Sequence, residues 1–293
     1  MILLFLAQTL RIAIPFLFAA AGGAISERAG IVALTLEGFM LGGAFGAVLG
    51  SYYFESAWMG ILTGMSAGLF LGLIHAVACI RFRADQVVSG VAINLFAVGV
   101  TRFFLDVAFQ SSSNSPRVDG FGGEGLTALA ALLSNPLVWL GVAVMPVLSF
   151  VVARTTFGLR VRAVGEHPEA AASVGVPVTR VRYVAVVWSG ILASLGGVYL
   201  ALDQHQFTDN MTAGRGFIAL AAVIFGRWHP VRAGIACLLF AAAETLQIQL
   251  QAAQVIPSQF VEMIPYLLTI IAVAGVVGRS RPPAALNRVD DAH

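Results

Sequence analysis

GEHPEAAASVGVPV, residues 165–178, is a short polar stretch that lies between two long apolar runs at 136–153 and 181–201. Each run is close to the ~20 mostly apolar residues that an α-helix needs to cross a bilayer. The whole chain of 293 residues is 58% hydrophobic and only 11% charged, whereas a soluble domain carries about 25% charged residues. The sequence therefore predicts an all-α, polytopic membrane protein in which the polar stretch lies outside the bilayer.

Apolar segments recur along the whole chain. The candidate spans are residues 1–24, 31–50, 57–80, 86–109, 136–153, 181–201, 233–248 and 260–277, and residues 216–225 form a ninth segment that is too short to cross alone. We expect about eight to nine transmembrane helices, some of them short or broken. Because no soluble domain or long linker interrupts them, we predict a single transmembrane domain over residues 1–293, with a polar loop at about 154–182.

The 17 basic residues are all arginine, and they are unevenly placed. Thirteen fall in the loops near residue 28, 81–83, 154–182 and 227–232 and in the tail from residue 279, which alternating spans would place on one side. Only Arg117 and Arg215 fall on the other side. Since cytoplasmic loops carry the excess of basic residues, we predict a multi-pass protein of the bacterial cytoplasmic (inner) membrane with a cytoplasmic C-terminus.

Several kinds of chemistry need residues that this chain lacks. Without lysine it cannot form a Walker A phosphate loop or a Schiff base, so any ATP that powers it would bind a separate polypeptide. Its two cysteines, Cys79 and Cys237, lie far apart in apolar runs, and no metal-ligand spacing or nucleophile–base pair is recognisable. We therefore expect no catalytic residue, metal site or cofactor in this chain, and a membrane-embedded enzyme has no motif to support it.

Glycine is periodic in two neighbouring spans. The periodic residues are Gly60, Gly64, Gly68 and Gly72 in one span and Gly42, Gly46 and Gly50 in the span before it. Small residues at every fourth position form a flat helix face, which lets two backbones approach closely inside a membrane. We predict that these two helices pack tightly against each other.

The 165–178 stretch carries the signals of a short helix. Pro168 suits its first turn and Glu169 suits its positive N-terminus. Alanines 170–172 favour continuation, and Gly175 followed by Pro177 stops it. So short a helix is marginal alone, and it is either a docking element held in a partner's groove or an ordinary surface turn.

A family resemblance bears on this choice. Glu169-Ala170-Ala171 followed by Gly175 resembles the EAA–G coupling motif of bacterial ABC importer permeases. Stretches similar to the nucleoside and simple-sugar branch, which is like the branched-chain amino acid permeases, are ISERAGIV (25–32), LEG (36–38), GLR (158–160), RAVGE (162–166), GRGFIALA (214–221) and IFGRWHP (224–230). The resemblance implies a cytoplasmic coupling helix that docks in a groove of an ATPase. The coupling residues it implies are Gly165, Glu166, Glu169, Ala170, Ala171 and Gly175.

The resemblance also implies partners and cargo. Separate ABC ATPase subunits would bind ATP and Mg, and a second homologous permease, or a second copy of this chain, would complete the pathway in the membrane lipid. An extracytoplasmic substrate-binding protein would deliver the cargo, and no nucleic acid partner is expected. Nucleosides are the first expectation, with simple sugars, flavin or branched-chain amino acids as alternatives. Ala33 stands where this branch often has Asn, near the expected path, so the cargo stays open.

Four residues inside apolar spans are candidates for the substrate pathway: Glu37, Phe39, Asn94 and Phe217. An ionisable group in a span is a functional candidate by default, and Glu37 would be the coupling carboxylate if the protein were an ion-driven secondary transporter instead. Equally, Glu37 could cap a helix break beside Gly38. Asn94 either lines a cavity or bonds neighbouring helices, and the two Phe rings either stack on a base or fill space.

Three further patterns lead to expectations. Residues 30–34 and 216–220 share three of five residues and are expected to run in opposite directions, as in an inverted repeat. Arg102 and Asp106 are four residues apart and can pair on one helix face. The Ser- and Gly-rich loop 110–135 is either a mobile contact for a binding protein or a plain connector.

Overall fold

The computed structural model describes residues 2–121, 128–253 and 281–287. Its helices are α1 (Ile2–Arg28), α2 (Leu36–Phe54), α3 (Ala57–Ala76) with the π-helical turn η1 (Val77–Arg81), α4 (Gln86–Phe109), α5 (Ala128–Ser134), α6 (Pro136–Arg154), α7 (Thr156–Glu166), α8 (Pro168–Ser173), α9 (Val178–Gln204), α10 (Arg215–Phe225) and α11 (Pro230–Ala253). The described ranges contain no strand, only an isolated bridge between Asn114 and Thr208. The predicted all-α class is confirmed.

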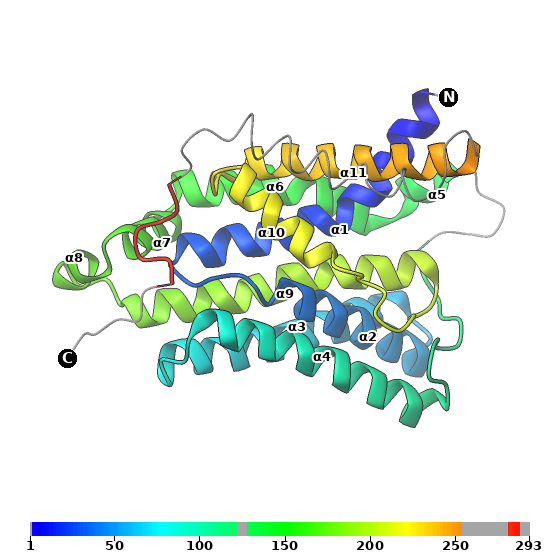
Figure 1. Ribbon diagram of the computed structural model, residues 1–293, viewed down its shortest axis with the longest axis horizontal. Coiled ribbons are helices and arrows are strands. Elements are labelled where there is room, and N and C mark those ends of the chain that lie inside the picture. Colours follow the sequence, from blue (N-terminus) through cyan, green and yellow to red (C-terminus); the bar gives the residue numbers. More distant parts are fainter. Residues whose placement is uncertain (1, 122–127, 254–280, 288–293) are drawn as a thin grey trace.

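The long helices lie along one axis, with α8 at one extremity and the N-terminus and α5 at the other (Figure 1). We refer to these as the α8 end and the α5 end. Within the described residues, six helices are long and apolar enough to cross a bilayer: α1, α3 with η1, α4, α6, α9 and α11. The protein is therefore a multi-pass membrane protein. The predicted span at 260–277 lies outside the described residues.

One predicted span begins at the wrong residue. Residues 31–35 are not helical, and α2 starts at Leu36. Side chains from another helix, α4, bond the backbone of this non-helical segment: the Val32 N–H donates to Gln86 Oε1 at 2.8 Å, and Asn94 Nδ2 donates to the Leu34 carbonyl at 2.9 Å. Irregular backbone is tolerated at membrane depth only where protein groups satisfy it in this way. Hydropathy alone cannot detect such a break because the segment is as apolar as a helix.

The predicted packing of the two glycine-rich helices is confirmed. A Cβ atom added to Gly60 would lie 2.8 Å from the Ala47 carbonyl oxygen, and one added to Gly64 would lie 2.7 Å from the Gly43 carbonyl oxygen. The same face of α3 continues against α9, where a Cβ at Gly72 would lie 3.2 Å from the backbone of Val186. The glycines thus let α3 contact two neighbouring helices, α2 and α9, at backbone distance.

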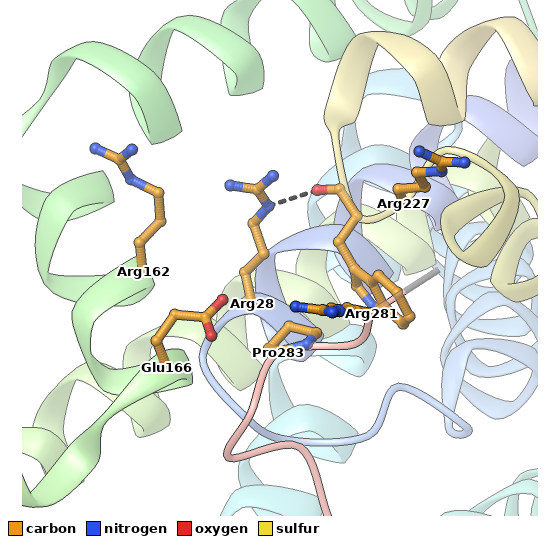
Figure 2. Close-up of a pocket in the computed structure, with 7 residues that line it drawn as sticks. Arg28, Arg162, Glu166, Arg227, Arg281 and Pro283 are labelled. Atoms are coloured by element: carbon orange, nitrogen blue, oxygen red, sulfur yellow. Dashed lines mark hydrogen bonds between the residues drawn. The ribbon is translucent and has the colours of Figure 1, made fainter. Parts of the chain in front are cut away.

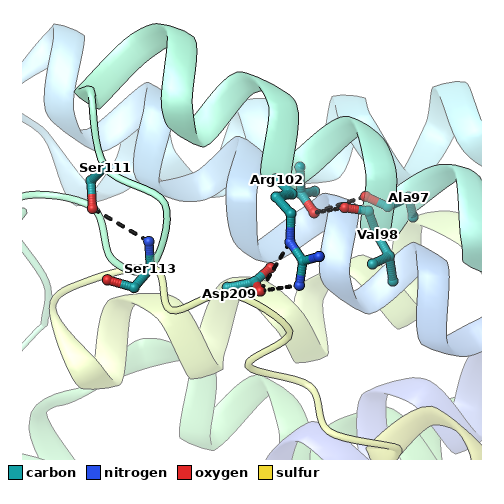
Figure 3. Close-up of polar contacts among 7 residues, drawn as sticks. Ala97, Val98, Arg102, Ser111, Ser113 and Asp209 are labelled. Carbon is teal, nitrogen blue, oxygen red and sulfur yellow. Dashed lines mark hydrogen bonds and ion pairs between the residues drawn. The ribbon is translucent and has the colours of Figure 1, made fainter.

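The loop after α4 is anchored on the loop before α10. The Val118 N–H donates to the His205 carbonyl at 2.9 Å, and the Phe207 N–H donates to Ser115 Oγ at 2.8 Å. Figure 3 shows Arg102 of α4 donating through two guanidinium nitrogens to one oxygen of Asp209. The expected pairing of Arg102 with Asp106 is therefore wrong, because the 205–214 loop folds back beside α4 and supplies a closer carboxylate.

Candidate functional site

The α7–α8 segment protrudes from the α8 end of the bundle (Figure 1). His167 separates the two helices, and Pro168 opens α8, which is six residues long. Pro is compatible with this position because the first turn has no hydrogen bond to lose. Glu169 and Ala170 are exposed on α8, whereas Ala171 is only 4% exposed and faces the bundle.

Gly175 ends α8 with a left-handed turn. Its φ is +83°, its N–H donates to the Ala172 carbonyl at 2.9 Å, and the next N–H, of Val176, donates to the Ala171 carbonyl at 3.0 Å. This pair of bonds is the Schellman motif, in which glycine is favoured because it has no Cβ to strain. A Cβ at Gly175 would have nothing within 4 Å, so glycine is needed here for its backbone conformation alone.

Gly165 has a different role from Gly175. It is buried, and a Cβ there would overlap the carbonyl oxygen of Arg28 at the end of α1. Its own carbonyl accepts the Ala285 N–H at 2.9 Å, and Glu166 Oε2 accepts the Ala284 N–H at 3.4 Å. Gly165 and Glu166 therefore join α7 to α1 and to the C-terminal segment 281–287.

The six residues expected from the resemblance to take part in coupling are thus divided by the fold. Glu169, Ala170 and Gly175 are exposed on the protruding turn, and Gly165 and Ala171 fasten it to the bundle. Sequence analysis missed Val174, whose side chain is 78% exposed beside Gly175. The signal for it was a branched apolar residue within a polar loop. Single exposed apolar side chains are common on protein surfaces, so Val174 belongs to a contact surface only together with the exposed Glu169 and Ala170 of the same protrusion.

A second feature lies inside the bundle, where α2 and α10 begin. Glu37, in the first turn of α2, is 7% exposed and accepts hydrogen bonds from the residues that start α10. Oε1 accepts the Thr212 hydroxyl at 2.6 Å and the Gly214 N–H at 2.8 Å, and Oε2 accepts the Gly216 N–H at 2.7 Å. The unpaired N–H groups and dipole of a helix N-terminus favour a negative charge at this place. Glu37 therefore holds the starts of α2 and α10 together.

Asn94 of α4 bonds the same junction from its other side. Its Oδ1 accepts the Gly38 N–H at 2.8 Å, while its Nδ2 bonds Leu34 as described above. Phe39 is fully buried and packs edge-on against His75, with ring centroids 6.4 Å apart. Phe217, in the first turn of α10, is 47% exposed. The structure brings Glu37, Asn94 and the start of α10 together, and of the four pathway candidates only Phe217 has a large exposed surface.

The end of α1 is fixed to the α10–α11 turn by residues that sequence analysis did not single out. Trp228 Nε1 donates to Glu27 Oε2 at 2.5 Å, and Arg28 Nε donates to the Trp228 carbonyl at 2.5 Å. Glu27 Oε1 also accepts the Ala33 N–H at 3.3 Å. Beside Trp228, burial and the charges of Arg28 and Arg232 lower the pKa of His229 below its usual value, so the neutral imidazole is favoured.

The short sequence repeat does not correspond to a repeated local structure. Residues 30–34 form a non-helical segment with turns at both ends, whereas residues 216–220 lie within α10. Nevertheless α2 and α10, which begin at the same junction, run in opposite directions from it (Figure 1). In the described residues, no group of three His, Cys, Asp or Glu side chains could hold a metal ion.

The chain was compared with known proteins. The family described as branched-chain amino acid transport system/permease component matches residues 5–273. The guanosine ABC transporter permease protein NupQ of Bacillus subtilis (strain 168) is 40% identical over 94% of this chain and 93% of its own length. The nucleoside ABC transporter permease protein NupC of Lactococcus lactis subsp. cremoris is 36% identical, over 92% of this chain and 91% of its own.

Among solved structures, an inward-facing metal-chelate type ABC transporter has a similar fold. The TM-score is 0.52 at 15% sequence identity, and the match covers 90% of this chain and 85% of the other. At this identity the similarity concerns the fold alone. It confirms that a helical membrane bundle of this arrangement is one that ABC transporters use.

Proposed function

This chain belongs to the family of branched-chain amino acid transport system permease components and is a permease subunit of an ABC transporter; we propose that it imports nucleosides. The cargo rests on two relatives that cover more than nine-tenths of the chain and whose names specify guanosine and nucleosides. The observation that carries the proposed mechanism is the protruding turn formed by α8 and Gly175.

We propose that α8 docks on an ABC ATPase subunit, which binds ATP and Mg. Supporting this, α8 exposes Glu169, Ala170 and the neighbouring Val174, and a helix of six residues is marginal unless it packs on other groups. With this docking the α8 end is cytoplasmic, as is the C-terminal segment, and the membrane is the bacterial cytoplasmic membrane. The excess of arginine near this end supports the same orientation.

The fold offers a continuous set of contacts from α8 to the interior. Movement of α8 would act on α7, and Gly165 of α7 touches the end of α1 at Arg28. From there, Glu27 and Trp228 join α1 to the α10–α11 turn, and α10 begins on Glu37. ATP-driven movement of α8 would therefore shift the α2–α10 junction, where the proposed pathway residues Glu37, Asn94 and Phe217 lie.

The proposed partners follow from the same function. A second permease, or a second copy of this chain, would form the other wall of the pathway, and an extracytoplasmic binding protein would deliver the nucleoside. The competing hypothesis is an ion-driven transporter with Glu37 as its proton- or ion-binding group. The geometry favours the ATP-driven mechanism, because both oxygens of Glu37 already accept hydrogen bonds from the start of α10.

The test is uptake of labelled guanosine into proteoliposomes. Liposomes with this chain, a second permease, the ATPase subunits and the binding protein should accumulate guanosine when ATP is enclosed with the ATPase, and an uncoupler should leave uptake intact. Accumulation by liposomes that contain this chain alone would overturn the proposal. Uptake of glucose, riboflavin or leucine in place of guanosine would retain the ATP-driven mechanism and reject the nucleoside assignment.

A further inference from the structure

A basic cavity lies at the α8 end of the bundle. It is separate from the protruding turn formed by α8 and Gly175, which we call the coupling turn, and from the α2–α10 junction. Its volume is about 290 Å³, and it is lined by Arg28, Arg162, Arg227 and Arg281 together with Glu166 and Trp228. These residues come from the end of α1, from α7, from the α10–α11 turn and from the C-terminal segment. Figure 2 shows the terminal nitrogens of Arg28 and Arg162 facing each other across the open space.

The charges around this cavity are unbalanced. Among the described residues, the guanidinium groups of Arg28, Arg162 and Arg281 border it together with one carboxylate, Glu166, one of whose oxygens already accepts the Ala284 N–H; the guanidinium group of Arg227 points away from these three (Figure 2). Guanidinium groups do not lose their protons in proteins, so they cannot relieve their repulsion by deprotonation. Like charges gathered around one space repel unless a counter-charge enters it. The cavity therefore favours an anion that carries more than one negative charge.

The cavity is also held in shape without a ligand. Trp228 is 6% exposed and is fixed through its ring nitrogen to Glu27 and through its carbonyl to Arg28. On the opposite side, the bond from the Ala285 N–H to the Gly165 carbonyl fastens the C-terminal segment to α7. A site whose walls are already in place loses less freedom on binding, which raises its affinity for a fitting ligand.

We propose that this cavity binds a phosphate group. A phosphate ester offers up to two negative charges and three acceptor oxygens, and the planar guanidinium fork matches this geometry with paired hydrogen bonds. The group could belong to a free phosphate or nucleotide, or to the headgroup of an anionic lipid, which basic pockets between transmembrane helices also bind. On the orientation given under the proposed function, the cavity opens to the cytoplasm.

Binding would act on the coupling segment. A phosphate shared by Arg28 and Arg162 would tie α7 to the end of α1, and α7 continues directly into α8. The ligand would hold the α7–α8 segment in the position seen here and so oppose its movement. The cavity is in this way a regulatory site, separate from the path of the cargo.

The experiment measures binding to the purified chain in a detergent that contains no phosphate. The free-phosphate probes are inorganic phosphate and guanosine 5′-monophosphate, and the lipid probe is short-chain phosphatidylglycerol, with phosphatidylcholine as its neutral counterpart. Arg162→Gln and Arg281→Gln each remove one lining charge. Arg160→Gln removes an exposed arginine of α7 that does not line the cavity, so it is the matched control.

We expect each of Arg162→Gln and Arg281→Gln to weaken binding about tenfold and Arg160→Gln to leave it unchanged. Wild-type binding should also weaken as salt is raised. Binding of the nucleotide or phosphate identifies a free ligand, and binding of phosphatidylglycerol alone identifies a lipid headgroup. Equal losses in all three variants would show non-specific attraction and overturn the proposal.

Two other outcomes would also overturn it. One is that none of the phosphate-bearing probes binds the wild-type protein while thermal unfolding shows that it is folded. The other is that Arg162→Gln and Arg281→Gln weaken only the association of the ATPase subunit, which would make the cavity part of the docking surface. These measurements need no transport assay, so their result does not depend on whether the nucleoside assignment is correct.

Discussion

Gly175→Ala is the most direct test of the coupling turn, because this glycine has a purely conformational role. Its φ of +83° is unfavourable for any residue with a Cβ, yet that Cβ would meet nothing within 4 Å. The substitution therefore strains the Schellman turn that ends α8 without disturbing any packed contact. Its effect should be confined to the protruding turn.

The magnitude follows from the backbone alone. Placing a non-glycine residue in the left-handed region costs about 1–2 kcal/mol. A free energy of this size changes a two-state population by a factor of about 5–30. Since α8 has only six residues and is marginal by itself, the strain should reduce the fraction of chains with an intact turn by a comparable factor. Global stability should change little, because the core is untouched.

The assay compares three variants in the reconstituted transporter. Gly175→Ala should lower ATP-driven guanosine uptake at least severalfold, while the midpoint of thermal unfolding stays close to that of the wild type. Gly175→Asn should restore part of the activity, because Asn tolerates the left-handed conformation. Gly165→Ala should instead lower thermal stability, because its Cβ would overlap the Arg28 carbonyl. In each case the ATPase subunits alone should still hydrolyse ATP.

Two results would refute this reasoning. If Gly175→Ala supports normal uptake, the turn does not couple ATP hydrolysis to transport in the way proposed. If Gly175→Ala and Gly175→Asn are equally inactive, backbone conformation at this position is not the cause of the loss.

Four further substitutions test hydrogen bonding, helix packing and a partly buried imidazole in the fold. Replacing Glu37 with Gln keeps the size of the side chain but exchanges an acceptor oxygen for a donor NH₂ group facing the start of α10. The free energy of unfolding should therefore fall by about 1–3 kcal/mol. Unchanged thermal stability in detergent would contradict the capping role. Gly64→Ala should destabilise the protein by about 1–3 kcal/mol because its Cβ would lie 2.7 Å from the Gly43 carbonyl oxygen. Gly99→Ala, where nothing lies within 4 Å, should instead stabilise α4 by about 0.5–1 kcal/mol, and the two changes should shift the unfolding midpoint in opposite directions. Burial and the charges of Arg28 and Arg232 lower the pKa of His229 from 6.5, so the unfolded chain binds a proton at this side chain more readily than the folded chain does. The contribution of His229 to stability is therefore fully present above about pH 6.5 and falls as the pH drops further. His229→Gln should reduce the change of the unfolding midpoint between about pH 7 and pH 5.

Much of the fold could be predicted because each membrane span requires a run of apolar residues, which is visible in the local sequence. The segment predicted at 86–109 has the same bounds as α4, and the α8 signals at Pro168 and Gly175 appear in the structure as a helix start and a Schellman turn. The glycine periodicity correctly indicated that α2 and α3 pack together. The glycine periodicity could not indicate that α9 packs on the rest of the same α3 face. Which helix packs there depends on the tertiary fold, because α9 is distant from α3 in the sequence.

Errors and omissions arose where an apolar sequence hides a change of backbone or a distant partner. Residues 31–35 have the composition of a span but are not helical, and Gln86 and Asn94 supply hydrogen bonds that a helix would otherwise make internally. Arg102 was assigned a partner four residues away, although its ion pair is with Asp209, 107 residues along the chain. Spacing along a helix predicts local neighbours only.

By itself, the sequence determined that this protein is helical, that it lies in a membrane and where a short polar helix interrupts its spans, because each of these depends on residues close together in the chain. Only the tertiary structure decided that Glu37 caps α10, whose first residues lie 175 or more positions along the chain, and that four separated arginines line one cavity. It also decided that Gly165 has no room for a side chain, whereas Gly175 is needed for its positive φ. The physical reason is that buried charges and close backbone contacts are satisfied by whichever groups the packed helices bring within reach. That set of neighbours does not exist until the chain has folded.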